Sequence, residues 1–179
     1  MLFSNDDIEF SSFIKSAFIH LNTDYPKFFK MDNLSKLAFL AADILLKEQE
    51  TNEDTAILLS NRASSLETDR KYQASISNKE SYYPSPSVFV YTLPNICIGE
   101  ISIKHQLHSE NSFFIFQQFN ANHLHTNAEY LIQNNKASQT LCGWVDFDDK
   151  SYEAFLYLVS EHGSIAHTPN EIMRLYHLK

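Results

Sequence analysis

The sequence predicts an α/β domain with a mixed, mostly parallel five-stranded sheet and helices on its faces. Thr55–Ser60 is a continuous apolar run, which is typical of a parallel strand buried on both faces. Apolar residues at helical spacing follow Asp32 as far as about Glu48. Thr140–Phe147 and Glu153–Ser160 lie too close together for a helical crossover, so these two strands should pair antiparallel.

Local patterns predict the remaining strands and the first helix. Phe13–Leu21 is interpreted as the first strand, and Ser112–Gln118 as another strand of the same sheet. Asp32 is a suitable N-cap for the helix that follows it, because its carboxylate can accept hydrogen bonds from free N–H groups. Residues 61–80 are polar and predict a loop with at most short helical turns.

Prolines and apolar spacing predict three further helices. A proline in the first turn favours a helix over Pro94–Leu107. Gly99 within this helix should cost about 1 kcal/mol relative to alanine, which a close backbone approach by a neighbour would explain. Ala121–Ile132 has an apolar helical face, and Thr168 can cap a short final helix with Pro169 at its first position.

Composition limits the class of protein. The 179 residues, 44% of them hydrophobic, suit one domain spanning residues 1–179 with one substantial core. The net charge of -8 and the lack of a basic stripe argue against nucleic acid as a partner. No run resembles a signal peptide or a membrane span, so we expect a cytoplasmic protein that does not bind membranes. The two cysteines, Cys97 and Cys142, are interpreted as buried apolar residues.

A family signature is carried by four segments in order: "FKMDNLSKLAFLAADILL", "SPSVFVYTLPNICIGEISIKHQL", "LCGWVD" and "YEAFLYLVSEHG". Their order and spacing, from about Phe28 to Gly163, resemble the N-terminal half of the β-ketoacyl-acyl-carrier-protein synthases. That resemblance implies a thiolase-like half-fold. It also implies that the loop after the first buried strand lies near a dimer partner.

In that family the nucleophile is a cysteine where a strand turns sharply into a helix, whose N-terminus lowers the thiol pKa. Aligned without gaps, this chain has Gln118 there, or Gln117 or Phe119 if the register slips by one. None of these can form an acyl thioester. The family's histidines and lysine belong to its second half, so we expect no catalytic residue. The resemblance implies these pocket or interface residues: Phe116, Gln117, Gln118, Phe119, Asn120, His123, Asn95 and Gly99.

A glutamine at this position also resembles chain-length factors and decarboxylating loading synthases. The implied function is therefore that of a non-catalytic partner or scaffold, without a cofactor, in fatty acid or polyketide-type synthesis. A half-fold should leave an apolar helix face uncovered, which favours a homodimer or a heterodimer with a full-length condensing enzyme. An acyl carrier protein is another candidate partner. The alternatives are an acyltransferase or malonyl decarboxylase whose site a partner chain completes, and an unrelated α/β binding domain.

Two groups of side chains raise the question of a metal site. The histidines are His105, His108, His123 and His125. The acidic residues of the final hairpin are Asp146, Asp148, Asp149 and Glu153. We expect the histidines to be scattered and solvated, since zinc needs further ligands at defined spacing. The acidic residues are interpreted as a solvated turn, because calcium loops need a glycine that is missing here. We therefore expect no metal.

Overall fold

The computed structural model describes residues 9–47, 53–148 and 151–178. In these residues a central sheet has four strands in the order β2-β1-β3-β4. Their bounds are Thr55–Asn61 (β1), Asn111–Ile115 (β2), Gln139–Asp148 (β3) and Ser151–Ser160 (β4). β1 pairs in parallel with β2 and β3, and β3 pairs antiparallel with β4. The predicted mixed sheet is confirmed, with four strands in place of five.

The predicted strand Phe13–Leu21 is wrong, because this segment lies in helix α1, Phe10–His20. Its buried residues Ile14, Ala17 and Phe18 recur at helical spacing and form one face. The ring of Phe18 stacks on that of Phe28 with centroids 4.4 Å apart. An apolar stripe that packs on neighbouring helices thus takes the place of the expected fifth strand.

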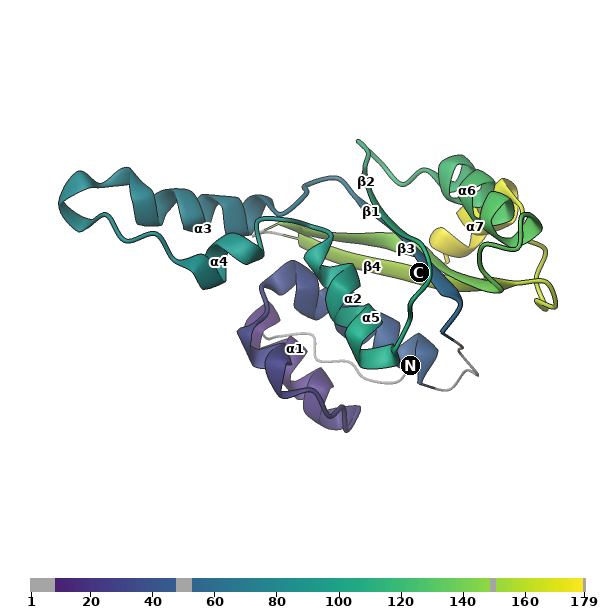
Figure 1. The fold of residues 1–179 in the computed structure, drawn as a ribbon, viewed down its shortest axis with the longest axis horizontal. Helices are drawn as coiled ribbons and strands as arrows, with labels where there is room; N and C mark the ends of the chain where they lie inside the picture. The colour runs from purple at the N-terminus through teal and green to yellow at the C-terminus, as the bar shows by residue number, and fades with distance from the viewer. Residues whose placement is uncertain (1–8, 48–52, 149–150, 179) are drawn as a thin grey trace.

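One face of the sheet is covered by helices, on the lower side in Figure 1. They are α1, the short 3-10 helix η1 (Pro26–Lys30), α2 (Asn33–Leu46) and α5 (Ile96–His105). Asp32 caps α2 as predicted, since its carboxylate accepts from the Ser35 backbone N–H at 2.9 Å. The same carboxylate accepts from the Thr68 hydroxyl at 2.8 Å, which fixes the next helix of the chain to the start of α2.

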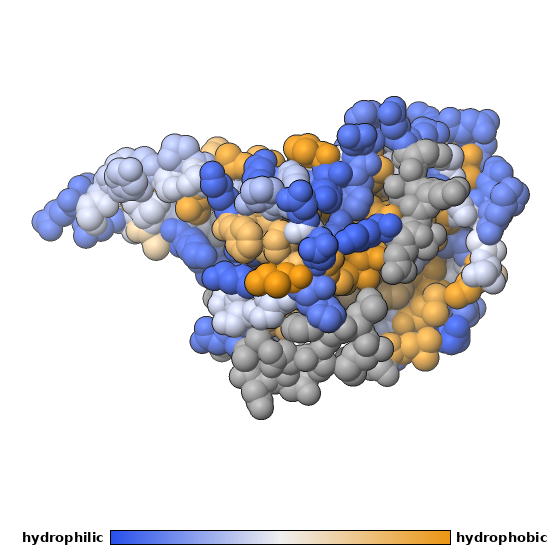
Figure 2. All heavy atoms as spheres, turned by 90° about the horizontal axis from the view of Figure 1, so that it is seen from below, coloured by the Kyte–Doolittle hydropathy of each residue, from blue (hydrophilic) through white to orange (hydrophobic). Residues whose placement is uncertain are grey.

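The expected uncovered apolar helix face is largely covered. Helix α2 packs against α1, α5 and the sheet, and nine of its residues are buried. Figure 2 shows the molecule from this helical side, where apolar side chains gather over the middle of the surface. The large apolar side chains that stay exposed on these helices include Ile19, Phe29 and Ile103. Because α1 occupies the face, this surface gives a weaker argument for a partner than the sequence predicted.

The opposite face is covered by α6, Ala121–Gln133, and α7, Pro169–Tyr176, and the sequence predicted both helices. Leu124 of α6 and Ile172 of α7 are buried against this side of the sheet. The Thr168 hydroxyl accepts from the Glu171 N–H at 3.3 Å and caps α7, with Pro169 at its first position. Two hydrophobic clusters therefore enclose one sheet.

The predicted loop over residues 61–80 is wrong, because α3 spans Leu66–Ser77. It is followed by the 3-10 helix η2, Lys79–Ser81, and by α4, Pro86–Val90. Helices α3 and α4 lie side by side and project away from the sheet, at the left of Figure 1. We call residues 66–93 the arm. Helix α3 has one buried residue, Thr68, so no apolar periodicity marked it in the sequence.

A buried carboxylate gives the fold an acid-sensitive contact. Asp43 of α2 is 2% exposed, accepts from the Thr23 hydroxyl at 2.7 Å and lies 3.2 Å from Nε2 of His105. Burial alone would raise the pKa of Asp43, but the contacts with His105 and Thr23 outweigh it and lower the pKa below its ordinary 3.8. As the pH falls below 3.8, Asp43 binds a proton more readily in the unfolded chain than in the folded protein. The free energy of unfolding therefore decreases as the pH falls.

We therefore expect Asp43→Asn to destabilise the protein near neutral pH, and we expect this penalty to shrink as the pH falls below 3.8. Urea unfolding of both proteins at several pH values between about 3 and 7 measures the difference. Asp24→Asn is the control, because Asp24 is exposed. A penalty for Asp43→Asn that stays constant down to about pH 3 would contradict this assignment.

Candidate functional site

A cleft of about 820 Å³ opens at the carboxyl ends of the parallel strands. Arg62 comes from the end of β1, Gln117 and Gln118 from the loop between β2 and α6, Asp146 from β3 and Tyr176 from α7. A second cavity of about 660 Å³ lies against the same loop. Crevices at this edge of a parallel sheet are where α/β proteins bind ligands, so the cleft is the candidate site.

The loop over residues 116–120 places the predicted nucleophile position at the cleft. Gln117 and Gln118 are exposed and line both cavities. Phe119 is 6% exposed, and its ring centroid lies 4.6 Å from that of Tyr176 and 5.6 Å from that of Phe155. Phe119 therefore anchors the loop in the core, while Gln118 has the exposure that a residue meeting a substrate or partner needs.

The N-terminus of α6 is capped by its own chain. Asn120 precedes the helix, and its side-chain oxygen accepts from the His123 backbone N–H at 3.0 Å. This carbonyl takes one of the free N–H groups with which a helix N-terminus stabilises a thiolate. The His123 ring packs edge-on to Phe114 and Phe116, with centroids 4.5 Å and 5.0 Å away. His123 thus supports the loop from an aromatic cluster.

Two of the predicted pocket residues lie elsewhere. Asn95 and Gly99 belong to α5 and the turn before it, among the helices on the other face of the sheet. Both are exposed. A methyl group added at Gly99 would meet nothing within 4 Å, so the expected close approach of a neighbour is wrong. The structure therefore gathers residues 116–120 around the cleft and the second cavity, with His123 behind them, and leaves Asn95 and Gly99 outside both.

Asp146 holds the base of the cleft together and is not the solvated residue that the sequence predicted. Its carboxylate accepts from the backbone N–H groups of Arg62 and Ala63 at 3.1 Å and 3.0 Å, and from the Arg62 side chain at 3.2 Å. Asp146 is 7% exposed, so these contacts tie the end of β1 to β3. Asp148 pairs with Arg70, and Asp149 lies outside the described residues.

Asp146→Ala is expected to destabilise the fold by about 1–3 kcal/mol, because two backbone donors lose their acceptor. Asp148→Ala removes an ion pair at 3.1 Å to an arginine whose side chain is 53% exposed, and should change stability by less than about 1 kcal/mol. Urea unfolding of the two variants measures both effects. Equal effects would show that Asp146 does not hold the strand ends.

The cleft offers groups that bind and orient, and its described lining contains no thiol. Burial first, and then the Glu153 carboxylate, raise the pKa of Tyr176 to about 12, so its hydroxyl stays a hydrogen-bond donor. Cys97 and Cys142 are buried in α5 and β3, as predicted, and burial raises the pKa of both thiols. Neither thiol is placed to act as a nucleophile here.

The histidines are less scattered than predicted. His108 is exposed, in agreement with the sequence. His105 is largely buried against Asp43, and His125 faces Glu129 and His167. No pattern in the sequence indicates this last group, because His167 comes from the loop before α7, far along the chain from α6. Across the part of the chain that the structure describes, no helix has the length and apolar character to cross a membrane.

Comparisons with known proteins place the fold. No family model and no curated protein matches the chain. Among solved structures, "The ishigamide ketosynthase/chain length factor" matches with 23% identity and a TM-score of 0.61. That match covers 66% of this chain and 35% of the other, so the chain spans about a third of that protein.

Two further structures agree. A ketosynthase in complex with its chain length factor from Xenorhabdus doucetiae matches with 16% identity and a TM-score of 0.64, over 86% of this chain and 73% of the other. A type II polyketide synthase acyl-carrier protein in complex with its ketosynthase matches with 16% identity and a TM-score of 0.51, over 78% and 46%. The chain therefore has the thiolase-like fold of ketosynthases and chain length factors, over part of their length.

Proposed function

We propose that this protein is a non-catalytic partner of a full-length condensing enzyme in fatty acid or polyketide-type acyl-chain synthesis. One observation carries the proposal. At the turn from β2 into α6, where the resemblance puts the family's cysteine, the exposed residues are Gln117 and Gln118. A carboxamide cannot form an acyl thioester. On this proposal the cleft is retained from a condensing-enzyme fold without its chemistry, and it contacts the partner protein or holds a bound acyl chain.

The arm supports the choice of a protein partner. Five large apolar side chains between residues 82 and 93 are 45–79% exposed: Tyr82, Tyr83, Phe89, Val90 and Leu93. Soluble monomers rarely expose apolar residues so closely grouped, and aromatic side chains are enriched at protein interfaces. The resemblance to synthases implies that residues 61–80, which lead into this segment, lie near a dimer partner.

The free edge of the sheet is a second surface for such a partner. β2 pairs with β1 on one side, and no other described strand pairs with it. It contains two phenylalanines, Phe113 and Phe114, and its backbone groups are available to a neighbouring strand. The solved neighbours include a ketosynthase in complex with its chain length factor, which is the type of assembly that we propose here.

The alternative is an acyltransferase or malonyl decarboxylase whose site the partner completes. The cleft supports this enzymatic alternative because it has a volume of about 820 Å³ and is lined by the polar side chains of Gln118, Arg62 and Glu153. The test uses malonyl-loaded acyl carrier protein and the complex of this chain with a ketosynthase of the same host. We expect Gln118→Ala to bind the ketosynthase normally and to leave the decarboxylation rate unchanged. A rate that is abolished by Gln118→Ala would establish the enzyme instead.

A further inference from the structure

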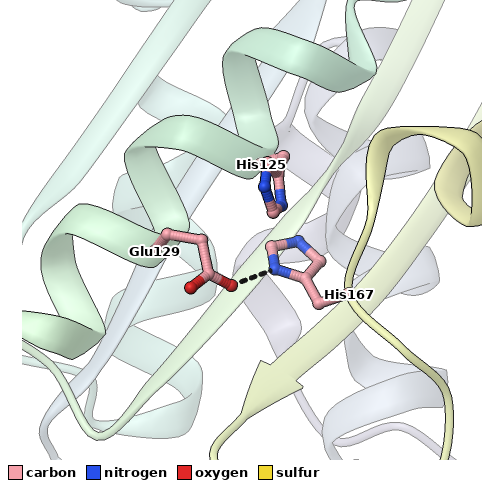
Figure 3. A group of neighbouring side chains, drawn as sticks. All are labelled: His125, Glu129 and His167. Carbon is pink, nitrogen blue, oxygen red and sulfur yellow. Dashed lines mark hydrogen bonds and ion pairs between the residues drawn. The ribbon is translucent and has the colours of Figure 1, made fainter.

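Three potential metal ligands converge on the side of the sheet covered by α6 and α7. They are His125 and Glu129 of α6 and His167 from the loop before α7 (Figure 3). His125 and Glu129 are four residues apart and therefore lie on one face of the helix. None of the three lines the cleft of the candidate site. The group therefore lies outside the cleft itself.

The distances are short enough for one ion. One ring nitrogen from each histidine and one carboxylate oxygen of Glu129 lie within 4.8 Å of one another. Nδ1 of His167 is 2.8 Å from Oε1 of Glu129, and the centroids of the two imidazole rings are 4.7 Å apart. A tetrahedral ion with bonds of about 2.0–2.1 Å holds its ligand atoms roughly 3.4 Å apart. Ligand atoms that lie 4.8 Å apart would have to approach by about 1.4 Å, whereas Nδ1 of His167 and Oε1 of Glu129 would have to move apart by about 0.6 Å to share one ion.

The histidines have ring nitrogens that the described protein does not satisfy. Nδ1 of His125 and Nε2 of His167 are both buried and lack a hydrogen-bond partner. A buried polar atom without a partner is energetically unfavourable, so such atoms usually mark a water or an ion. The side chains are only 14% exposed for His167 and 35% for Glu129, so the protein already holds them in place.

Both oxygens of the Glu129 carboxylate take part in hydrogen bonds. Oε1 lies 2.8 Å from Nδ1 of His167. Gln133, one turn further along α6, donates to its other oxygen at 2.9 Å and fixes the orientation of the carboxylate. Outer hydrogen bonds of this kind are typical of carboxylates that bind metals.

We propose that His125, Glu129 and His167 form a binding site for a divalent transition metal ion, zinc before others. Two imidazole nitrogens and one carboxylate oxygen are the donors that zinc accepts, whereas magnesium and calcium prefer oxygen alone. Three protein ligands leave a fourth position for water. The ion would join α6 to the loop before α7. Met173 and Tyr176 of α7 line the cleft. Metal binding would therefore hold α7 in place across the candidate site.

The test starts from full-length protein stripped of metal with a chelator and titrated with zinc chloride in a calorimeter. We expect one zinc per chain. His125→Ala and His167→Ala should each weaken binding by roughly 100-fold or more, because losing even an outer-shell partner costs about 10–100-fold. His162→Ala is the matched control, since His162 is an exposed histidine close to His167 in the chain. It should bind zinc as the native protein does.

Thermal unfolding gives a second readout. Zinc should raise the unfolding midpoint of the native protein and of His162→Ala, and leave that of His167→Ala unchanged. Cobalt in place of zinc should give the visible absorption of a tetrahedral site in the same two proteins. If zinc does not bind, or binds His125→Ala and His167→Ala as tightly as the native protein, the proposal is wrong and Glu129–His167 is only a hydrogen-bonded pair.

Discussion

Gly143→Ala is expected to destabilise the protein by about 1–3 kcal/mol or more. A Cβ atom at Gly143 of β3 would collide with the backbone oxygen of Phe155 in β4. It would also lie 3.0 Å from Cγ and 3.1 Å from Cα of Leu156. A flexible side chain could rotate away, but a backbone carbonyl in a strand ladder cannot. The two strands would have to separate where Gly143 pairs with Leu156.

Gly99→Ala is the matched control for this prediction. Gly99 lies in helix α5 with nothing within 4 Å of an added methyl group. Alanine there should stabilise the protein by about 0.5–1 kcal/mol, because glycine is a poor helix former. Urea unfolding of the two variants measures both changes. Stability of Gly143→Ala equal to that of the native protein would show that β3 and β4 are not packed as described.

Tyr83→Ser is expected to weaken binding to a full-length ketosynthase of the same host by roughly 30-fold, which corresponds to about 2 kcal/mol. Tyr83 lies on the arm with 79% of its surface exposed, so its loss should leave the fold intact. A buried tyrosine at an interface contributes both apolar area and a hydroxyl that can hydrogen-bond. Calorimetric titration of each variant with the ketosynthase gives the two affinities.

Tyr130→Ser is the corresponding control for the arm. Tyr130 is also an exposed tyrosine, at 54%, but it lies on α6, away from the arm. The same change there should leave the affinity unaltered. An equal effect of the two substitutions would mean that the arm is not the contact surface, and the free edge at β2 would then be the remaining candidate.

The sequence predicted the sheet where burial leaves a clear pattern. β1 is buried at all seven positions, which is why its apolar run was unambiguous. The two strands β3 and β4 were recognised as an antiparallel pair from their spacing alone. The sequence identifies Asp32 and Thr168 as helix caps, because a short polar side chain just before a helical segment can accept a hydrogen bond from a free N–H group of the first turn.

The errors have physical reasons as well. Phe13–Leu21 contains aromatic and β-branched residues that suit a strand, yet its buried positions follow a helical period, and short apolar runs do not separate the two. Helix α3 is fixed by long-range bonds, including one from Asn33 to Glu67 at 3.0 Å, and these leave no mark on local sequence. Only packing distinguishes Gly143 from Gly99.

The candidate site was predictable in part. The resemblance to condensing enzymes located the loop around Gln118, and the structure places this loop at the cleft. The role of Asp146 was missed because its partners, the backbone N–H groups of Arg62 and Ala63, come from a distant strand end. His167 was missed for the same reason, since its partners lie on α6.

The central claim is that this chain acts as the partner of a full-length condensing enzyme. The most direct test is size-exclusion chromatography with light-scattering detection at micromolar concentration. It is run on the chain alone and on the chain mixed with a full-length ketosynthase of the same host. We expect the chain to co-elute with the ketosynthase at a mass that includes both proteins. A chain that remains at the 20.7 kDa of one monomer, alone and in every mixture, would contradict the claim.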